Sequence, residues 1–348
     1  MIRRIFFINS LSFDYLEDLL FAGLTELLGV ENLVSFPTNY HYYFSKYRYP
    51  KNIGQCRPPA RYVVDRLKLK TKVAKFEFDA VVIGSTKQDA FVSYLEIADA
   101  LPKGIPLIYV DGGDRPEIGG DAIRQGFLPL FRDVWSRRKI DLVFKREYLL
   151  SREYDSNVFP LPFALKPTAF QSRINDKKYQ VVFWVVESDP IRTEVLEMVQ
   201  DKYDCRKNGT TTGIVFKKYK RRGKFFLEEL SASKIAYNFK GAGWDTLRYW
   251  EIPGVGTFMI SGEPKIRIPN NFEHGRQLVF CREDLSDLLP LTEYYLKHED
   301  ERESIARAGH QHVLEHHTYR RRAEYFLDVC NEMLSRAVTK KEPAVKES

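Results

Sequence analysis

The chain has 348 residues, 44% of them hydrophobic and 29% charged, a balance typical of a globular protein large enough for two domains. No run of 18 or more apolar residues occurs, so no transmembrane helix is expected, and four scattered cysteines without a CxxC pair favour reduced thiols in a cytoplasmic protein. The formal net charge of +7 fits anionic ligands, an anionic membrane surface or nucleic acid.

Strands and helices alternate through the first half of the sequence. Leucines between Leu16 and Leu28 recur at helical spacing, and Gly29 is suited to end that helix. A second helix is predicted near Ala90–Leu101. Short apolar runs predict strands at Ile5–Asn9, Leu33–Phe36, Ala80–Gly84, Pro106–Val110, Asp141–Lys145 and Val158–Pro162. This alternation predicts a parallel sheet covered by helices on both faces.

A second alternating unit follows a linker placed at Pro162–Lys178, which is rich in proline and polar residues. Asp189 and Pro190 supply an N-cap and a first helical residue for a helix over Ile191–Val199. Strands are predicted at Gln180–Val186, Gly213–Phe216, Lys234–Asn238, Thr257–Ile260 and Leu278–Cys281, and long helical patterns cover Leu285–Lys297 and Glu301–Leu334. The sequence predicts an α/β protein of two Rossmann-like domains, 1–165 and 175–335, facing a cleft, with a disordered tail over 336–348.

The segment from Leu230 to Glu251 carries the clearest sign of a binding site. A strand leads into a glycine loop, with Gly241 and Gly243, that opens a helix whose unpaired N–H groups suit a phosphate. Arg248 and Glu251 are three residues apart and therefore share one helix face. A cation for a diphosphate and a carboxylate for sugar hydroxyls then face one cleft, which predicts a site for a nucleotide-sugar.

The order of features from Ser233 to about Asp328 resembles the C-terminal domain of the CgeB-like (spore maturation protein) glycosyltransferases, relatives of the group 1 glycosyltransferases of the GT-B fold. The matching pieces are Ser233-Lys234-Ile235 with Asn238, Gly243, Arg248-x-x-Glu251-x-x-Gly254-x-Gly256, an acidic segment around Phe280–Leu288, and His317-Thr318 before Arg322-Ala323. In the first half the resemblance is architectural, with Phe144-Lys145-Arg146 as a further echo. It implies the GT-B fold and a final helix, Tyr319–Leu334, that packs back across the hinge.

In the wider family a Glu-seven-residues-Glu motif closes around the donor, and its second Glu precedes a glycine by five positions. Glu251 with Gly256 matches that second Glu, whose implied role is hydrogen bonding to the ribose hydroxyls. The first Glu would fall at Gly243, which has no carboxylate, and Asp245 is out of register. This departure leaves the usual sugar-hydroxyl contact and the stereochemical outcome open.

Further donor-binding candidates surround these two residues. Arg248 is a candidate for the diphosphate, and Arg192, in the loop after the first strand of the second domain, is another. The predicted donor site also includes Asn238, Gly243, Trp244, Asp245 and Thr246. A capping role is favoured for Asp245-Thr246, with Thr246 also suited to a phosphate, and Trp244 is either a core anchor or a pocket wall.

Three residues are candidates for the general base that an inverting transfer needs to take the acceptor proton. Asp111 and Asp114 lie in a DGGD stretch after a strand, which can equally be a plain turn, and His41 is the third. The run from His312 to His316 spells HxxEH, but a short pattern in a histidine-rich helix arises by chance, and no metal site is predicted.

The sequence thus predicts a metal-independent glycosyltransferase, without a cofactor, that moves a sugar from a nucleotide-diphosphate sugar to an unidentified acceptor, a glycan, a protein or DNA. Two alternatives stay open. The missing carboxylate at Gly243 also fits a binding or structural protein that kept the fold and lost the chemistry. Basic clusters such as Lys217–Lys224 and the aromatic segment Asn39–Pro50 also fit a DNA-modifying glycosyltransferase.

Overall fold

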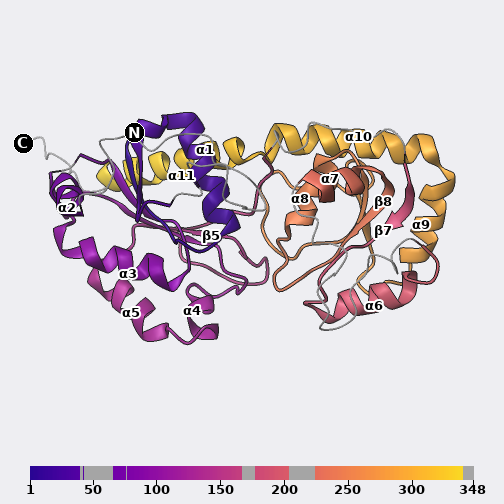
Figure 1. The fold of residues 1–348 in the computed structure, drawn as a ribbon, viewed down its shortest axis with the longest axis horizontal. Coiled ribbons are helices and arrows are strands. Elements are labelled where there is room, and N and C mark those ends of the chain that lie inside the picture. Colours follow the sequence, from indigo (N-terminus) through magenta and orange to yellow (C-terminus); the bar gives the residue numbers. More distant parts are fainter. Residues whose placement is uncertain (40–41, 43–65, 76, 167–176, 204–223, 340–348) are drawn as a thin grey trace, which may run out of the picture.

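A computed structural model describes residues 1–39, 42, 66–75, 77–166, 177–203 and 224–339. These residues form two lobes that lie side by side along the long axis, each built around a parallel β-sheet (Figure 1). His41, the strand predicted at Gly213–Phe216, most of the predicted linker and residues 340–348 of the predicted tail lie outside the described residues.

The first lobe is built on six parallel strands in the order β2-β1-β3-β4-β5-β6. Alternate residues of each strand point to opposite faces, so Phe7 of β1 packs under helix α1 while Phe6 packs under helix α3. The strands are β1 (Ile5–Ile8), β2 (Leu33–Phe36), β3 (Ala80–Ile83), β4 (Leu107–Asp111), β5 (Leu142–Lys145) and β6 (Val158–Pro160). Every strand predicted in this half is confirmed, with its ends within two residues.

Helices cover both faces of this sheet, as predicted. Asp14 caps the longest of them, because its carboxylate accepts from the N–H groups of Leu16 and Glu17 at 3.2 and 3.3 Å, and Gly29 ends it with a φ of 84°. The helices are α1 (Tyr15–Leu28), α2 (Arg66–Ala74), α3 (Gln88–Ile97), α4 (Gly120–Arg124) and α5 (Leu128–Arg137), with short 3-10 turns η1 (Val30–Asn32) and η4 (Ala98–Ala100).

The second lobe is built on four parallel strands in the order β10-β9-β8-β7. They are β7 (Tyr179–Val182), β8 (Ser233–Asn238), β9 (Phe258–Gly262) and β10 (Val279–Cys281), surrounded by α6 (Pro190–Val199), α7 (Lys224–Ser231), α8 (Leu247–Gly254), α9 (Leu288–Lys297) and α10 (Glu299–His316). Asp189 caps α6 and Pro190 is its first residue, as predicted. Strand β7 ends four residues before the predicted Val186.

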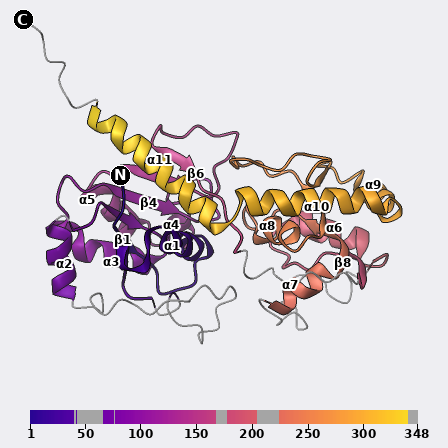
Figure 2. The same cartoon turned by 90° about the horizontal axis from the view of Figure 1, so that it is seen from above.

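The long helical pattern over Glu301–Leu334 is two helices, α10 and α11 (Tyr319–Thr339), and the break between them joins the lobes. The N–H of Leu165 donates to the carbonyl of His317, and the N–H of Tyr319 donates to the carbonyl of Leu165, both at 2.8 Å. Helix α11 then runs back along α1, as Figures 1 and 2 show. The predicted crossing is confirmed. The prediction grouped α11 with residues 175–335, whereas in the structure this helix packs on the first lobe.

Of the helices in the described part of the chain, none combines the length and the apolar character that a membrane span requires.

Candidate functional site

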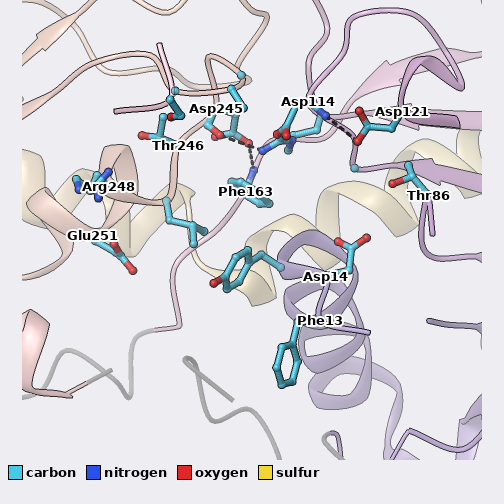
Figure 3. A pocket seen from close by; sticks show the side chains of 18 of the residues that line it. Phe13, Asp14, Thr86, Asp114, Asp121, Phe163, Asp245, Thr246, Arg248 and Glu251 are labelled. Carbon is cyan, nitrogen blue, oxygen red and sulfur yellow. Dashed lines mark hydrogen bonds and ion pairs between the residues drawn. The ribbon is translucent and has the colours of Figure 1, made fainter. Parts of the chain in front are cut away.

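A cavity of about 450 Å³ lies between the lobes, at the carboxyl ends of both sheets. Loops that follow β1, β3, β4, β5 and β6 form its first-lobe wall, and the loops after β7 and β8 form the second-lobe wall together with α8. Figure 3 shows Asp14, Thr86 and Asp121 on one side of this space and Arg248 and Glu251 on the other.

The helix α8 begins at the cavity wall. Thr246 is its N-cap, because its Oγ1 accepts from the N–H of Tyr249 at 3.4 Å and donates to Oδ1 of Asn238 at 2.6 Å. Asn238 is buried at the end of β8 and its Nδ2 donates to Oγ of Ser261 at 3.1 Å. Thr246 lines the cavity, whereas Asn238 stands behind it and holds the cap in place. The predicted cap is therefore Thr246, and Asp245 makes other contacts.

Two arginines lie together on the second-lobe wall. Arg192 is 4% exposed, and its guanidinium donates to the carbonyls of Phe239, Lys240 and Val186. Burial, and then the charge of Arg248, lower the pKa of Arg192 to about 9. Burial also lowers the pKa of Arg248, against the raising effect of Glu251. Burial disfavours the charge of both arginines, so a bound anion would stabilise this site.

The guanidinium of Arg248 has donors left for a ligand. Its Nε donates to the carbonyl of Trp184 at 2.9 Å, and its terminal nitrogens donate to no residue in the described ranges. Glu251 lies one turn further along α8, is 8% exposed and lines the same cavity. The structure therefore brings the predicted pair together at the cavity, as Figure 3 shows.

The loop before α8 is joined to the first lobe by a pair of carboxylates. Glu147, which follows β5, accepts from the N–H groups of Trp244 and Asp245 at 2.9 and 3.0 Å. The carboxylate of Asp245 in turn accepts from the N–H of Phe163 at 2.5 Å and from Nε1 of Trp250 at 2.9 Å. We call this set of contacts the clasp. Glu147 and Asp245 are 2% and 3% exposed, so water is excluded from it.

Gly243 and Trp244, both predicted to bind the donor, have different positions. Gly243 lines the cavity, and a Cβ there would overlap the carboxylate of Glu147. Trp244 is half-buried against the core between the lobes, with Nζ of Lys240 5.3 Å from its ring centre, and it is not among the described residues that line the cavity. The core-anchor role left open for Trp244 fits this position better than the pocket wall.

Asp114 lies on the first-lobe wall among opposite charges. It pairs with Arg146 and, at 3.9 Å, with Arg124, and about a third of its side chain is exposed. Burial alone would lower the pKa of Arg146, but Glu147, Asp245 and Asp114 raise it above its usual value. The Arg146 guanidinium lies 4.5 Å from the ring centre of Phe163, which also lines the cavity.

Asp111, the other described candidate for the base, points away from the cavity. It is fully buried, pairs with Nζ of Lys145 at 2.9 Å and accepts from the N–H groups of Gly113 and Gly119. These contacts shape the DGGD turn, and an acceptor hydroxyl has no access to this carboxylate. The general-base expectation for Asp111 is corrected for that reason, and His41 lies outside the described residues.

Several wall residues were missed by the sequence reasoning. Asp14 and Phe13 come from the loop after β1, Thr86 and Lys87 from the loop after β3, and Arg146 from the loop after β5. The rule that ligands bind beyond the carboxyl ends of parallel strands pointed to each of these loops. The prediction for the first half favoured the loop with Asp111 and Asp114, because carboxylates suggest acid–base chemistry.

His312, from the HxxEH run, and His317, which directly follows the run, contact the same backbone carbonyl. Nε2 of His312 and Nε2 of His317 each lie 2.8 Å from the carbonyl of Asn270, and burial lowers the pKa of both imidazoles. His317 also contacts Arg322 at 2.9 Å and lies against the ring of Trp250. These contacts give the histidines a packing role between α8, α10 and α11.

Comparisons with known proteins give the fold and one domain. Residues 206–328 match the model of a family described as glycosyl transferase-like. The match takes in β8, the clasp residues of the second lobe, α8, all of α10 and the first part of α11. No curated protein matches the sequence.

Solved structures with the same architecture are GT-B glycosyltransferases, which confirms the predicted fold class. HepE of Anabaena, in complex with UDP-glucose, is 9% identical with a TM-score of 0.57 over 95% of this chain and 100% of that one. An alpha-glucosyltransferase in complex with UDP and a DNA 13-mer containing an A:G mismatch is 11% identical, with a TM-score of 0.58 over 94% and 98%. Sucrose-phosphate synthase of Thermosynechococcus elongatus is 10% identical, with a TM-score of 0.54 over 96% and 100%.

Proposed function

We propose that this protein is a glycosyltransferase that moves a sugar from a nucleoside-diphosphate sugar to an acceptor held by the first lobe. The arginine pair carries this proposal. Arg248 directs spare donors at a cavity beside the start of α8, and in the described part of the chain the charge of Glu251 is the one that raises its pKa. A diphosphate supplies the missing negative charge, and Glu251 is placed to accept hydrogen bonds from sugar hydroxyls.

Transfer in this proposal needs no metal ion, because side chains supply the positive charge. As the bond to the sugar breaks, negative charge grows on the leaving diphosphate, and Arg248 with the first N–H groups of α8 stabilises it. The cavity lies between lobes, so the donor would be shielded from water once it is filled.

The acceptor would bind against the first-lobe wall. Phe13 is 47% exposed there and offers an aromatic surface, and Asp14 and Asp114 offer carboxylates for hydroxyl groups. Of the predicted bases, Asp114 is the described one that an acceptor can reach, so we assign it the general-base role.

A finer relationship and a location complete the proposal. The order of Ser233-Lys234-Ile235, Asn238 and Arg248-x-x-Glu251 supports a place among the CgeB-like glycosyltransferases. A cytoplasmic location is supported by Cys281 and Cys330, the described cysteines, which are both buried free thiols.

A binding screen tests the donor half of the proposal. Melting temperature is measured with the UDP-, GDP-, ADP- and TDP-linked forms of glucose, and the form that binds is expected to raise it. Release of nucleoside diphosphate without acceptor is then followed over hours. We expect R248A and E251A each to weaken donor binding about tenfold to a hundredfold, as loss of a hydrogen bond to a charged group does.

The matched control is R132A, which removes an exposed arginine of α5 that makes no contact with the cavity. It should bind the donor like the wild type. No melting shift with any of the four nucleotide-sugars at millimolar concentration would contradict the proposal, as would a donor whose affinity R248A and E251A leave unchanged.

A further inference from the structure

The clasp places a first-lobe carboxylate inside a second-lobe loop. The loop of residues 241–246, which we call the donor loop, connects β8 to α8 and supplies five cavity-lining residues, Gly241, Ala242, Gly243, Asp245 and Thr246. Two of its N–H groups, those of Trp244 and Asp245, donate to Glu147. Glu147 is 2% exposed and is not among the described cavity-lining residues, so it acts on the cavity through the loop.

Glycine at position 243 makes room for this contact. A Cβ on Gly243 would overlap Oε1 of Glu147 and lie 2.7 Å from its carboxyl carbon. Glu147 therefore occupies the space that a side chain at position 243 would take. The family motif places its first glutamate at position 243. The structure has a carboxylate close to that position, and it comes from the opposite lobe.

A positive charge lies beside Glu147 in the clasp. Arg146 Nη2 lies 3.6 Å from Oε1 of Glu147, and Arg146 Nη1 donates to the carbonyl of Asp245 at 3.1 Å. Hydrogen bonds from N–H groups to a buried carboxylate are stronger than those to a neutral acceptor. Loss of the carboxylate would leave two loop N–H groups without a partner in a site that excludes water.

We propose that Glu147 is a positioning residue for the donor, a first-lobe carboxylate that fixes the shape of the second-lobe donor loop and so completes the donor site only when the lobes are together. This inference rests on the proposed function for the identity of the ligand. The shape of the loop fixes Thr246, and Thr246 fixes where α8 begins and where Arg248 stands.

Amide hydrogen exchange tests the clasp without any ligand. The probe is the peptide that spans the donor loop, followed by mass spectrometry in the full chain. We expect exchange in E147A to be at least about tenfold faster than in the wild type, because two N–H groups lose their acceptor. E153A is the matched control, since Glu153 is an exposed carboxylate six residues along the same segment. It should leave exchange in the loop unchanged.

A double-mutant cycle tests the role of Gly243. G243A inserts a methyl group where the Glu147 carboxylate lies, so it should speed loop exchange and weaken binding of UDP-glucose, the probe, by about tenfold. In an E147A background the obstacle is gone, so adding G243A should change affinity by less than about twofold. Additive losses would show that Gly243 serves some purpose other than making room for Glu147.

Binding separates a donor role from a general loss of stability. E147A should weaken binding of UDP-glucose at least about tenfold. G23A, which disturbs the packing of α1 on α11 away from the donor loop, should lower the melting temperature but leave the affinity for UDP-glucose within about twofold. E147Q, which keeps one acceptor oxygen, should recover part of the affinity. Exchange in E147A within twofold of wild type overturns the clasp, and unchanged UDP-glucose affinity overturns the donor role.

The proposed function and this inference fail in different ways. If the wild type binds none of the nucleotide-sugars in the screen, the proposed function fails and the donor role of Glu147 fails with it. Faster loop exchange in E147A would then still establish the clasp as a contact that ties the lobes. If the wild type binds a nucleotide-sugar and E147A binds it equally well, only the inference is overturned.

Discussion

Asp245 illustrates how a single buried carboxyl group can be tuned by its neighbours. Burial, together with the nearby Glu147, raises its pKa from 3.8 to about 6, although Arg146 and two hydrogen bonds act in the opposite direction. Burial lowers the pKa of Arg322, in α11, to about 10, and the charge of Asp245 acts in the opposite direction. The group that ties the donor loop to Phe163 is thus one that titrates near neutral pH.

This shift predicts a pH dependence of stability. A folded-state pKa of about 6 against an unfolded value near 3.8 means that the native state holds the proton more tightly, so stability falls as pH rises from about 4 to about 6. At about 1.4 kcal/mol per unit, Asp245 contributes about 3 kcal/mol to that fall. We therefore measure the free energy of unfolding in urea at pH 4, 5, 6 and 7 for the wild type and for D245N. As pH rises, the value for the wild type should fall by about this amount relative to the value for D245N.

The comparison with D245N is needed because other carboxyl groups titrate in the same range in both proteins. Glu17 and Asp18, both buried in α1, also have raised pKa values, mainly through burial. Their effects cancel in the difference. A difference between wild type and D245N that stays constant from pH 4 to pH 7 would contradict the assigned environment of Asp245.

Asp114 carries the second prediction at the scale of one residue. If it removes the proton of the acceptor hydroxyl, D114N should lower kcat about a hundredfold or more and leave the KM for the donor within about threefold. Steady-state kinetics with the donor and acceptor from the screen measure both constants. D121N is the matched control, because Asp121 lines the same wall but is 6% exposed and pairs with Arg124. A loss in D114N that appears only in the donor KM would remove it from the chemistry.

At the scale of helices and strands, local pattern predicted most of the fold. Runs such as Ala80–Ile83 are apolar at every position, and only a strand buried on both faces suits such a short run. Local pattern did not predict the break at His317, and the separate final helix from Tyr319 was implied by the family resemblance alone. The sequence there contains neither glycine nor proline, and the helix ends because the backbone of Leu165 takes the hydrogen bonds on either side of Thr318. A tertiary contact decided that boundary.

The packing of α11 on α1 predicts the effect of a one-carbon change. An alanine at Gly23 would gain up to about 1 kcal/mol of helix propensity, but its Cβ would overlap the carbonyl oxygen of Tyr319 and lie 2.8 Å from Cβ of Ala323. Because the obstacle is backbone, the overlap should outweigh the gain, and G23A should lose about 1–3 kcal/mol. Urea unfolding measures the loss, and hydrogen exchange in α11 should rise with it.

Ala22 provides the matched control for this change. It is the neighbouring residue of α1, it is only partly buried, and A22S adds a single oxygen atom. A22S should stay within about 0.5 kcal/mol of the wild type. A G23A protein as stable as the wild type would show that α11 and α1 do not pack as closely as the structure has them.

At the scale of the whole molecule, the contacts that join the lobes in the described part of the chain include three sets of hydrogen bonds. The clasp is the first, the backbone bonds of Leu165 to the α10–α11 junction are the second, and an antiparallel bridge between Leu149 and Ile266 is the third. One hydrophobic cluster also runs through both lobes and includes Phe163, Trp250 and Phe326. The cavity is built across these joints, so its geometry depends on all of them.

This continuity predicts how the protein unfolds. Scanning calorimetry should show one cooperative transition, with calorimetric and van't Hoff enthalpies that agree, because neither lobe keeps its full core without the other. L165P, which removes the N–H that bonds to His317, should weaken the connection and separate the melting of the lobes. Two resolved transitions in the wild type would show that the lobes melt independently.

The candidate site was only half visible in the sequence. Arg248 and Glu251 could be predicted because both stand on one short helix, where spacing fixes their direction. Glu147 could not, since its role depends on where residues about a hundred positions apart meet across two sheets. Asp111 was misassigned for the related reason that its place after a strand is visible in the sequence, whereas its burial against Lys145 is not.

The return of α11 also has a consequence for the order of the chain. The N–H of Ile2 donates to the side chain of Asn331 at 2.8 Å, so residues from both ends of the described chain stand together on the first lobe. The second lobe is in effect an insertion that leaves this body near residue 166 and returns to it at 318. A chimera with a second lobe from another protein would therefore need junctions at both of these points. A chimera joined at the linker alone would carry a last helix whose contact surface fits the first lobe of the other protein.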